Sequence, residues 1–286
     1  MQEKDLIEKH LENYEDVFKD IINVLLFQGR EVLRGEMVEQ SVTQSVYFME
    51  GHIRGQDRDI AKYWLSDGFR LAFLGIENQS RVDKYMPMRL LSYDGAAYRS
   101  QLQRKGKKRC YPVITVVLYF GYKYRWKKYK CLHECVHIPK ELMPYVNDYK
   151  MNLFEIAFLP EESVCKFQSD FRIIADYFVQ MRVKGNYIPG NIGMKHPYET
   201  MKLLSVLTKD NRFLMVCEKN EKGGMTMCEV LDRVEQRGYK AGEKRGEKRG
   251  RFNVLKELVE NGVLSLSEAA KHINMSEEKF RNKILK

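Results

Sequence analysis

The chain has 286 residues, of which 44% are hydrophobic and 31% are charged, and its formal net charge is +10. This composition excludes a disordered chain, and the length allows either one sizeable core with an appendage or two modest domains. The first residues lack the features of a signal peptide, and the apolar run 21–27 is too short to span a bilayer. We therefore expect a cytoplasmic protein without a membrane partner. Its basic surplus favours a polyanion, above all nucleic acid.

Hydrophobic periodicity predicts alternating helices and strands along the first two thirds of the chain. In chain order these are a helix over 5–28, strands over 59–65 and 69–76, a helix over 86–103, strands over 111–121 and 152–159, and helices over 167–182 and 198–207. The stretch 36–50 is ambiguous, although its Thr, Val and Tyr residues favour an extended chain. Asp67-Gly68 is a hairpin turn signal between the first two strands.

This order predicts an α/β fold in which helices flank a mixed sheet. The run 111–121 is rich in β-branched residues and almost continuously apolar. Such runs are typical of strands that are buried on both faces. We therefore place this strand in the interior of a domain that covers residues 1–225.

The character of the chain changes after that domain. The charged segment 226–250 carries the string Gly-Glu-Lys-Arg twice, at 242–245 and at 246–249. Glycine at every fourth position weakens a helix without forbidding it. We therefore predict an exposed, partly helical connector.

The last segment, 251–286, predicts two or three short helices with a small apolar face. Ser265 and Glu268 have the spacing of a capping box. The segment is either a miniature helix-turn-helix that binds DNA or a packing and self-association module. We favour the module, and with it a possible homo-oligomer, because so short a helix-turn-helix signal arises easily by chance.

Six cysteines are scattered without the spacing of a disulfide framework, so free thiols are expected. Cys131, His133, Cys135 and His137 are all zinc-ligand types. On a strand, however, they would spread over about 20 Å at about 3.3 Å per residue. A zinc ion needs its donors at about 2.0–2.3 Å. On a helix only part of the set would converge, and we expect no zinc site.

Two carboxylates have the placement that phosphodiester hydrolysis requires. That chemistry uses a divalent cation, and magnesium prefers one or two carboxylates together with waters and phosphate oxygens. Asp59 begins the first predicted strand and Glu77 follows the second, so an antiparallel hairpin would bring both to one open end. Alternation places Gln79 on the same face as Glu77 and Asn78 on the opposite face, with the Asn78 main-chain carbonyl as a further ligand.

Asp59 followed by Glu77-Asn78-Gln79 resembles the PD-(D/E)XK nuclease signature, with glutamine where lysine is usual. Longer strings closely resemble the Rpn family of recombination-promoting nucleases and putative transposases. They are Gly-Ile-Glu-Asn-Gln-Ser at 75–80, Met-Pro-Met-Arg at 86–89 and Tyr-Asp-Gly-Ala-Ala-Tyr-Arg at 93–99. The resemblance covers about residues 5–185.

The resemblance implies a restriction-endonuclease-like PD-(D/E)XK core and a magnesium-dependent DNA endonuclease, with manganese as a possible substitute, linked to recombination or mobile elements. It implies that Asp59, Glu77 and Gln79 are catalytic and that Asp59, Glu77 and Asn78 hold the metal. Neutral Gln79 can orient water or donate a hydrogen bond but cannot supply charge. Two rival hypotheses are a DNA-binding protein with a vestigial nuclease site and a self-assembling scaffold.

Several basic residues are predicted to contact DNA: Arg89, Arg99, Lys105 and Lys107. Arg89 and Tyr93 are four residues apart and share a helix face, so they contact phosphate or the carboxylates, or simply pack. Basic residues also cluster at 123–130 and at 240–251, where a solvated face and a DNA contact are equally good interpretations.

Other interpretations of the acidic residues stay open. Asp59 could instead pair with Arg54 or Arg58, and Glu77 with Arg81. Further candidate metal ligands are Asp57, Asp16 and Asp20.

Overall fold

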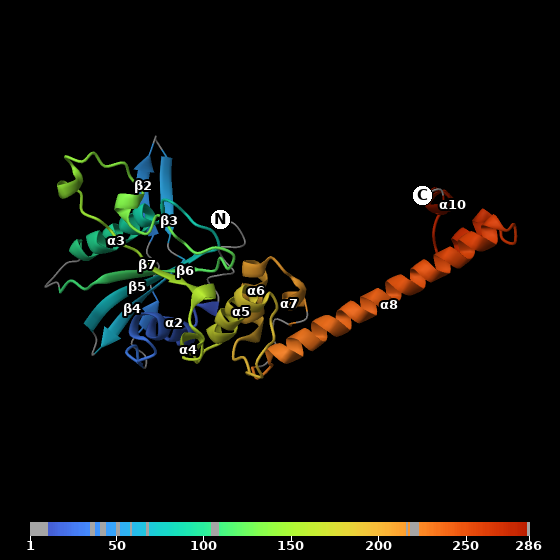
Figure 1. Ribbon diagram of the computed structural model, residues 1–286, viewed down its shortest axis with the longest axis horizontal. Coiled ribbons are helices and arrows are strands. Elements are labelled where there is room, and N and C mark those ends of the chain that lie inside the picture. Colours follow the sequence, from blue (N-terminus) through green and yellow to red (C-terminus); the bar gives the residue numbers. More distant parts are fainter. Residues whose placement is uncertain are drawn as a thin grey trace. The chain divides into compact units, whose positions relative to one another are not determined.

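The computed structural model describes residues 11–34, 38–40, 44–49, 52–57, 59–66, 69–103, 109–215, 217 and 223–284. For 38–40, 44–49, 52–57 and 69 it describes the backbone alone. The chain divides into two compact units, Met1–Val230 and Leu231–Lys286 (Figure 1).

The first unit is built on a mixed five-stranded sheet with the strand order β1-β4-β5-β6-β7 (Figure 1). Its strands are β1 (Val38–Gln40), β4 (Ile60–Ser66), β5 (Phe69–Gln79), β6 (Val113–Tyr119) and β7 (Asn152–Glu155). The pairs β1–β4 and β4–β5 are antiparallel, whereas β5–β6 and β6–β7 are parallel. Strands β2 (Gln44–Met49) and β3 (His52–Asp57) form a separate hairpin.

Helices cover both faces of this sheet, which confirms the predicted α/β arrangement. On one face, Ala97 of α3 (Met86–Leu102) packs with Ala61 and Phe73 from β4 and β5. On the other face, the Lys62 ammonium group lies 5.5 Å from the centre of the Phe18 ring in α2 (Glu15–Phe27). Figure 1 shows α3 and α2 on opposite sides of the strands. Successive residues of a strand point to opposite faces, so the sequence of β4 and β5 determines which side chains meet which helix.

The interior of the unit is centred on β6, as predicted. Val116, Val117 and Leu118 are fully buried, because helices cover the strand on both sides. Within the described residues, this unit also contains the helices α4 (Glu161–Val164), α5 (Phe171–Lys184), α6 (Pro197–Thr208) and α7 (Arg212–Met215). The same part of the chain contains the short 3-10 helices η1 (Leu132–Glu134), η2 (Met143–Tyr145) and η3 (Ile156–Phe158).

The hairpin that the site depends on is confirmed by its register. Ser66 pairs with Phe69 at the tip, although Asp67 and Gly68 themselves lie outside the described residues. Strand β5 continues to Gln79, three residues beyond its predicted end. The extension arises because β6 keeps pairing with it as far as the partners Gln79 and Tyr119.

Two predicted elements are wrong in their extent. The helix predicted over 5–28 does not run unbroken, because residues 12–14 form a turn and α2 begins at Glu15. The strand predicted over 152–159 ends at Glu155, where the chain tightens into η3. In both places the apolar pattern continues through the break, and periodicity alone cannot detect it.

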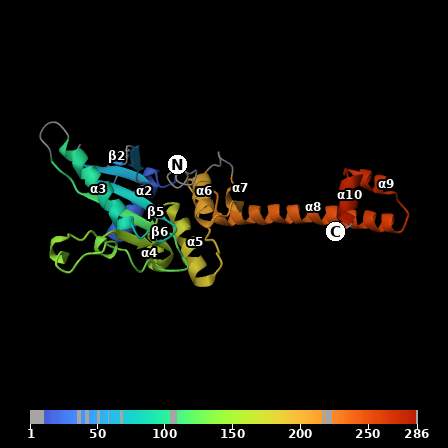
Figure 2. The same ribbon diagram turned by 90° about the horizontal axis from the view of Figure 1, so that it is seen from above.

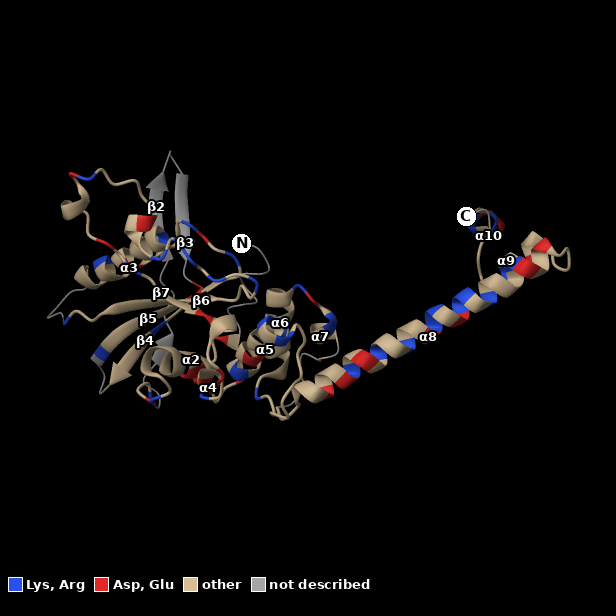
Figure 3. Ribbon diagram, in the orientation of Figure 1, with Lys and Arg blue, Asp and Glu red and all other residues tan. Residues whose placement is uncertain are grey.

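The charged connector is also more regular than predicted. Helix α8 (Met227–Glu260) is continuous over 34 residues and passes through both Gly-Glu-Lys-Arg strings. The glutamate, lysine and arginine residues between the glycines are strong helix formers, and they offset a cost of about 1 kcal/mol per glycine. Figure 3 shows basic and acidic residues interspersed along this helix, and residues 241–250 are exposed.

Two short helices, α9 (Leu266–His272) and α10 (Glu277–Ile284), lie beside the end of α8 (Figure 2). Phe280 is fully buried with Ala269 and Ala270 in a small apolar cluster that Phe252 of α8 joins. Ser265 and Glu268 form the predicted capping box. Self-association of this unit stays a prediction. None of the helices in the described part of the chain combines the length and the apolar character needed to cross a bilayer.

Candidate functional site

Asp59 and Glu77 come together on the α3 face of the sheet. Ile60 pairs with Ile76, so continuing the antiparallel register places Asp59 opposite Glu77. Both carboxylates affect the pKa of the same residue of α3, Tyr93. Burial and the negative charge of Glu77 raise the pKa of Tyr93, Asp59 adds to the rise, and the neighbouring Arg89 opposes it. The two predicted ligands are therefore adjacent where β4 begins and β5 approaches its end.

The Asp59 carboxylate is held by the backbone of the opposite strand. Its Oδ2 atom accepts a hydrogen bond from the Asn78 N–H at 2.8 Å. Hydrogen bonds to a carboxylate are stronger than those between neutral groups, so this bond fixes one oxygen of Asp59. The side chain is only partly buried, which leaves room for a ligand.

Glu12 is an acidic residue at this site that sequence reasoning missed. It is fully buried in the turn before α2, and its Oε2 atom accepts a hydrogen bond from Asn78 Nδ2 at 2.6 Å. Asn78 therefore links Glu12 on the α2 face to Asp59 at the edge of the α3 face. The periodicity of an unbroken helix could not place Glu12, since the chain turns at that point.

Because Asn78 donates a hydrogen bond to Glu12, we expect Asn78→Asp to destabilise the protein. This change places two carboxylates about one hydrogen-bond length apart in a buried position. We expect the free energy of unfolding to fall by about 3 kcal/mol at neutral pH. The loss should shrink as the pH falls from about 8 toward about 4, because protonating one carboxyl group of the pair removes the repulsion.

Urea unfolding at several pH values measures this effect. The matched control is Asn78→Ala, which removes the same hydrogen bond without adding a charge. It should cost about 1–3 kcal/mol and depend less steeply on pH than Asn78→Asp, because Glu12 loses a hydrogen-bond donor but gains no neighbouring charge. Equal, pH-independent losses in both variants would contradict the contact.

Glu77 is 1% exposed and has a cationic neighbour. Its Oε2 atom lies 3.5 Å from Arg89 Nη2, which also donates to the Tyr93 hydroxyl at 3.1 Å. Arg89 Nη1 forms a second ion pair with Asp83 at 3.0 Å. Burial opposes the charge on the guanidinium group, but Tyr93, Glu77 and Asp83 outweigh it and raise the pKa of Arg89. The cation thus offsets the cost of burying Glu77.

The other predicted residues occupy different positions. Gln79 lies on the Glu77 face and Asn78 on the opposite face, as strand alternation predicted. Arg89 shares its helix face with Tyr93 and contacts carboxylates, while its contact with DNA stays a prediction. Arg99 is exposed on α3.

Some predictions concern residues whose side chains the structure does not describe. Lys105 and Lys107 lie outside the described residues, as does Arg58. Asp57 and Arg54 are described as backbone only.

The donor set suits magnesium better than a metal held entirely by protein. Magnesium takes one or two carboxylates and completes its shell with water and substrate oxygens. Asp59 and Glu77 supply two carboxylates on one face, one partly exposed and one buried. No group of three or more His, Cys, Asp or Glu side chains converges within the part of the chain that the structure describes.

Two of the four alternating cysteine and histidine side chains, His133 and Cys135, form hydrogen bonds with backbone carbonyl oxygens. His133 Nε2 lies 2.8 Å from the Val146 carbonyl oxygen. The Cys135 thiol donates to the Cys131 carbonyl oxygen at 3.2 Å, with η1 between them. None of the six cysteines, all of which lie in the described part of the chain, forms a disulfide.

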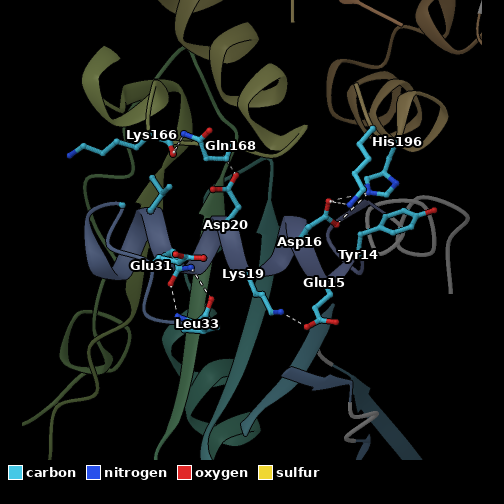
Figure 4. Close-up of a pocket in the computed structure, with 14 residues that line it drawn as sticks. Tyr14, Glu15, Asp16, Lys19, Asp20, Glu31, Leu33, Lys166, Gln168 and His196 are labelled. Carbon is cyan, nitrogen blue, oxygen red and sulfur yellow. Dashed lines mark hydrogen bonds and ion pairs between the residues drawn. The ribbon is translucent and has the colours of Figure 1, made fainter. Parts of the chain in front are cut away.

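Asp16 and Asp20 line a different pocket, of about 940 Å³, beside α2 (Figure 4). Asp16 forms an ion pair with Lys195 at 2.9 Å, and Asp20 accepts two backbone N–H bonds from residues 168 and 169. Burial opposes ionisation of Asp16, but Lys195 and His196 outweigh it and lower its pKa. Of these acidic residues near the N-terminus, Glu12 is the one that reaches Asn78.

A protein-family model described as a putative transposase, YhgA-like, matches residues 37–186, just over half of the chain. The matched range contains Asp59, Glu77, Asn78 and Gln79 but not Glu12. No curated protein matches the chain significantly, and no solved structure does.

Proposed function

Because the chain belongs to the YhgA-like putative transposase family, we propose that it is a metal-dependent DNA endonuclease that acts on mobile elements. Family membership agrees with the resemblance to the Rpn family and suggests an association with mobile elements. The cleavage chemistry is our proposal. It rests on one observation: Asp59 and Glu77 are adjacent on one face of a β-hairpin, at the end where β4 begins.

We also propose that the sheet is a PD-(D/E)XK core. Three features support this assignment: an antiparallel hairpin that carries both carboxylates, parallel strands beside it and helices on both faces. The hairpin matters most, because it brings together residues that are eighteen positions apart in the sequence.

The residues of the site have three proposed roles: holding the metal ion, orienting water or phosphate, and positioning Glu77. Asp59, Glu77 and the Asn78 main-chain carbonyl would hold magnesium or manganese. A bound cation supplies charge stabilisation at the scissile phosphate and an activated water. Gln79 follows on the same strand, and its neutral amide orients water or donates to a phosphate oxygen. Arg89 keeps the buried Glu77 carboxylate in place from α3.

Plasmid cleavage by the full-length protein tests the proposal. Supercoiled DNA is incubated with magnesium, manganese, calcium or a chelator. We expect nicked or linear product with magnesium or manganese and none with the chelator, because a bound divalent cation would be needed to activate the water and to stabilise charge at the phosphate. Cleavage that persists in the chelator would count against the metal requirement.

One observation favours a second candidate, a DNA-binding protein with a vestigial site. Gln79 stands where a lysine would stabilise charge on the attacked phosphate. Such a protein would bind duplex DNA with a steep dependence on salt and would not cut it with any cation.

A further inference from the structure

Residues 122–130 form a segment in which aromatic and basic residues alternate, Tyr-Lys-Tyr-Arg-Trp-Lys-Lys-Tyr-Lys. We call this segment the strap. It connects β6 to the turn at 131 and contains no regular secondary structure. None of the functions assigned above uses it.

The strap begins beside the candidate site. Gln79 and Tyr119 are paired at the ends of parallel strands, and the Phe120 N–H donates to the Gln79 carbonyl oxygen at 2.8 Å. The chain therefore enters the strap next to the predicted catalytic glutamine. Farther along, Tyr129 interacts electrostatically with Lys84 in the turn that follows β5. The pKa of Lys84 in that turn is raised by a hydrogen bond to Tyr85 and, more weakly, by Tyr129.

One aromatic residue fixes the strap to the protein. Trp126 is fully buried and packs edge-on against Tyr119, with ring centres 5.3 Å apart. It belongs to the same apolar cluster as Tyr93, the residue whose pKa is raised by Asp59 and Glu77. A shared core thus joins the strap to the site.

Polar contacts hold the backbone of the strap as well. The Trp126 N–H donates to Glu155 Oε1 at 2.7 Å, and Arg125 forms an ion pair with Glu155 Oε2 at 3.1 Å. The Tyr119 hydroxyl donates to the Tyr124 carbonyl oxygen at 3.1 Å. These contacts fix which side chains of the strap face the solvent.

The exposed side chains of the strap are one aromatic ring and five cations, which are Lys123, Arg125, Lys127, Lys128 and Lys130. Tyr124 is 78% exposed, and the exposed residues Lys123, Lys127 and Lys128 lie within four positions of it along the strap. Within the described residues, none of these three lysines forms an ion pair, whereas Arg125 between them does. The combination of an exposed aromatic ring and nearby basic residues along one segment is typical of surfaces that bind single-stranded nucleic acid.

We propose that the strap holds unpaired nucleotides of the DNA substrate beside Asp59 and Glu77. Tyr124 stacks on a base, and Lys123, Lys127 and Lys128 contact the phosphates on either side. This inference rests on the proposed nuclease function and specifies its substrate class, DNA with a single-stranded segment near the cleavage point.

The test is binding of fluorescent oligonucleotides, single-stranded and duplex, measured in a chelator so that no strand is cut. We expect the wild type to prefer the single strand. Tyr124→Ala should weaken that binding about tenfold, and Tyr124→Phe should retain it, because stacking needs only the ring. Lys127→Ala/Lys128→Ala should weaken binding at least tenfold at low salt and reduce the salt slope by about 1.4.

The matched control is Lys184→Ala/Lys209→Ala, which removes two exposed lysines of the same unit at the ends of α5 and α6. It should bind nearly as the wild type does. The proposal is overturned if the strap variants bind like this control, if the wild type prefers duplex DNA, or if it binds neither.

Parallel cleavage assays keep the two proposals separate. If the wild type cuts DNA and the strap variants bind DNA normally, the nuclease proposal is supported and the strap proposal is contradicted. If the strap variants lose DNA binding and the wild type does not cut, the strap proposal is supported and the nuclease proposal is contradicted.

Discussion

Replacing Asp59 by alanine should slow metal-dependent DNA cleavage by roughly 1,000-fold or more. A bound divalent cation contributes several kcal/mol of charge stabilisation, and each factor of ten in rate corresponds to about 1.4 kcal/mol. Asp59 is the more exposed of the two adjacent carboxylates and is fixed by the Asn78 N–H. Initial rates of plasmid nicking with magnesium measure the effect.

The fold should survive this change. Asp59 is partly exposed, and losing its hydrogen bond to Asn78 should lower the free energy of unfolding by about 1–2 kcal/mol. The matched control is Asp20→Ala, since Asp20 also accepts backbone N–H bonds but lies in the pocket beside α2. This control should lose some stability and keep its cleavage rate. Equal cleavage by Asp59→Ala and the wild type would contradict the assigned role.

Glu77→Gln should also remove cleavage, by at least about 100-fold, and should weaken manganese binding at least tenfold. The change keeps the shape of the buried side chain and removes only its charge, so an effect on cation binding reports the carboxylate itself. Electron paramagnetic resonance of free manganese, recorded without DNA, separates binding from chemistry.

Arg89 explains why Glu77→Gln should fold. The guanidinium group keeps its ion pair with Asp83 and its hydrogen bond to Tyr93 after the Glu77 charge is lost. We expect a change in the free energy of unfolding below about 2 kcal/mol. Glu162→Gln, an exposed carboxylate on α4, is the control and should bind manganese as the wild type does. Unchanged manganese binding in Glu77→Gln would exclude Glu77 as a ligand.

The part of the site that could be predicted from sequence depends on local chain geometry. Alternation along a strand and a two-residue turn suffice to bring Asp59 and Glu77 to one end of the hairpin and to separate Gln79 from Asn78. The exact position of Asp59 opposite Glu77 also depends on a register shift between Trp64 and Leu65, which these rules do not predict. The face shared by Arg89 and Tyr93 follows in the same way from the helical repeat. Each of these inferences spans fewer than twenty residues of sequence.

The contacts that were missed span much longer separations. Glu12 meets Asn78 across 66 positions, and the break in the first helix that permits it leaves no signal in the apolar pattern. Trp126 and Glu155 fix the strap across 29 positions, although the aromatic and basic composition of the strap is visible in the sequence. No local rule predicts which of its aromatic rings is buried and which is exposed.

The continuous length of helix α8 could not be predicted from the sequence. Its glycines argue against a helix, and its charged residues argue for one. The sequence predicts a partly helical connector, whereas the structure shows one continuous helix. Local propensities of opposite sign differ by only a few kcal/mol over such a segment, so the outcome cannot be predicted from their sum.

The central claim is that Asp59 and Glu77 together form the metal site of a nuclease. Its most direct test is a time course of plasmid cleavage by the wild type and by Asp59→Ala/Glu77→Gln, purified in parallel and assayed with magnesium and with a chelator. The claim predicts that the wild type cuts only with magnesium and that the folded double variant does not cut. Equal cleavage by both proteins, or no cleavage by a folded wild type with any divalent cation, would contradict it.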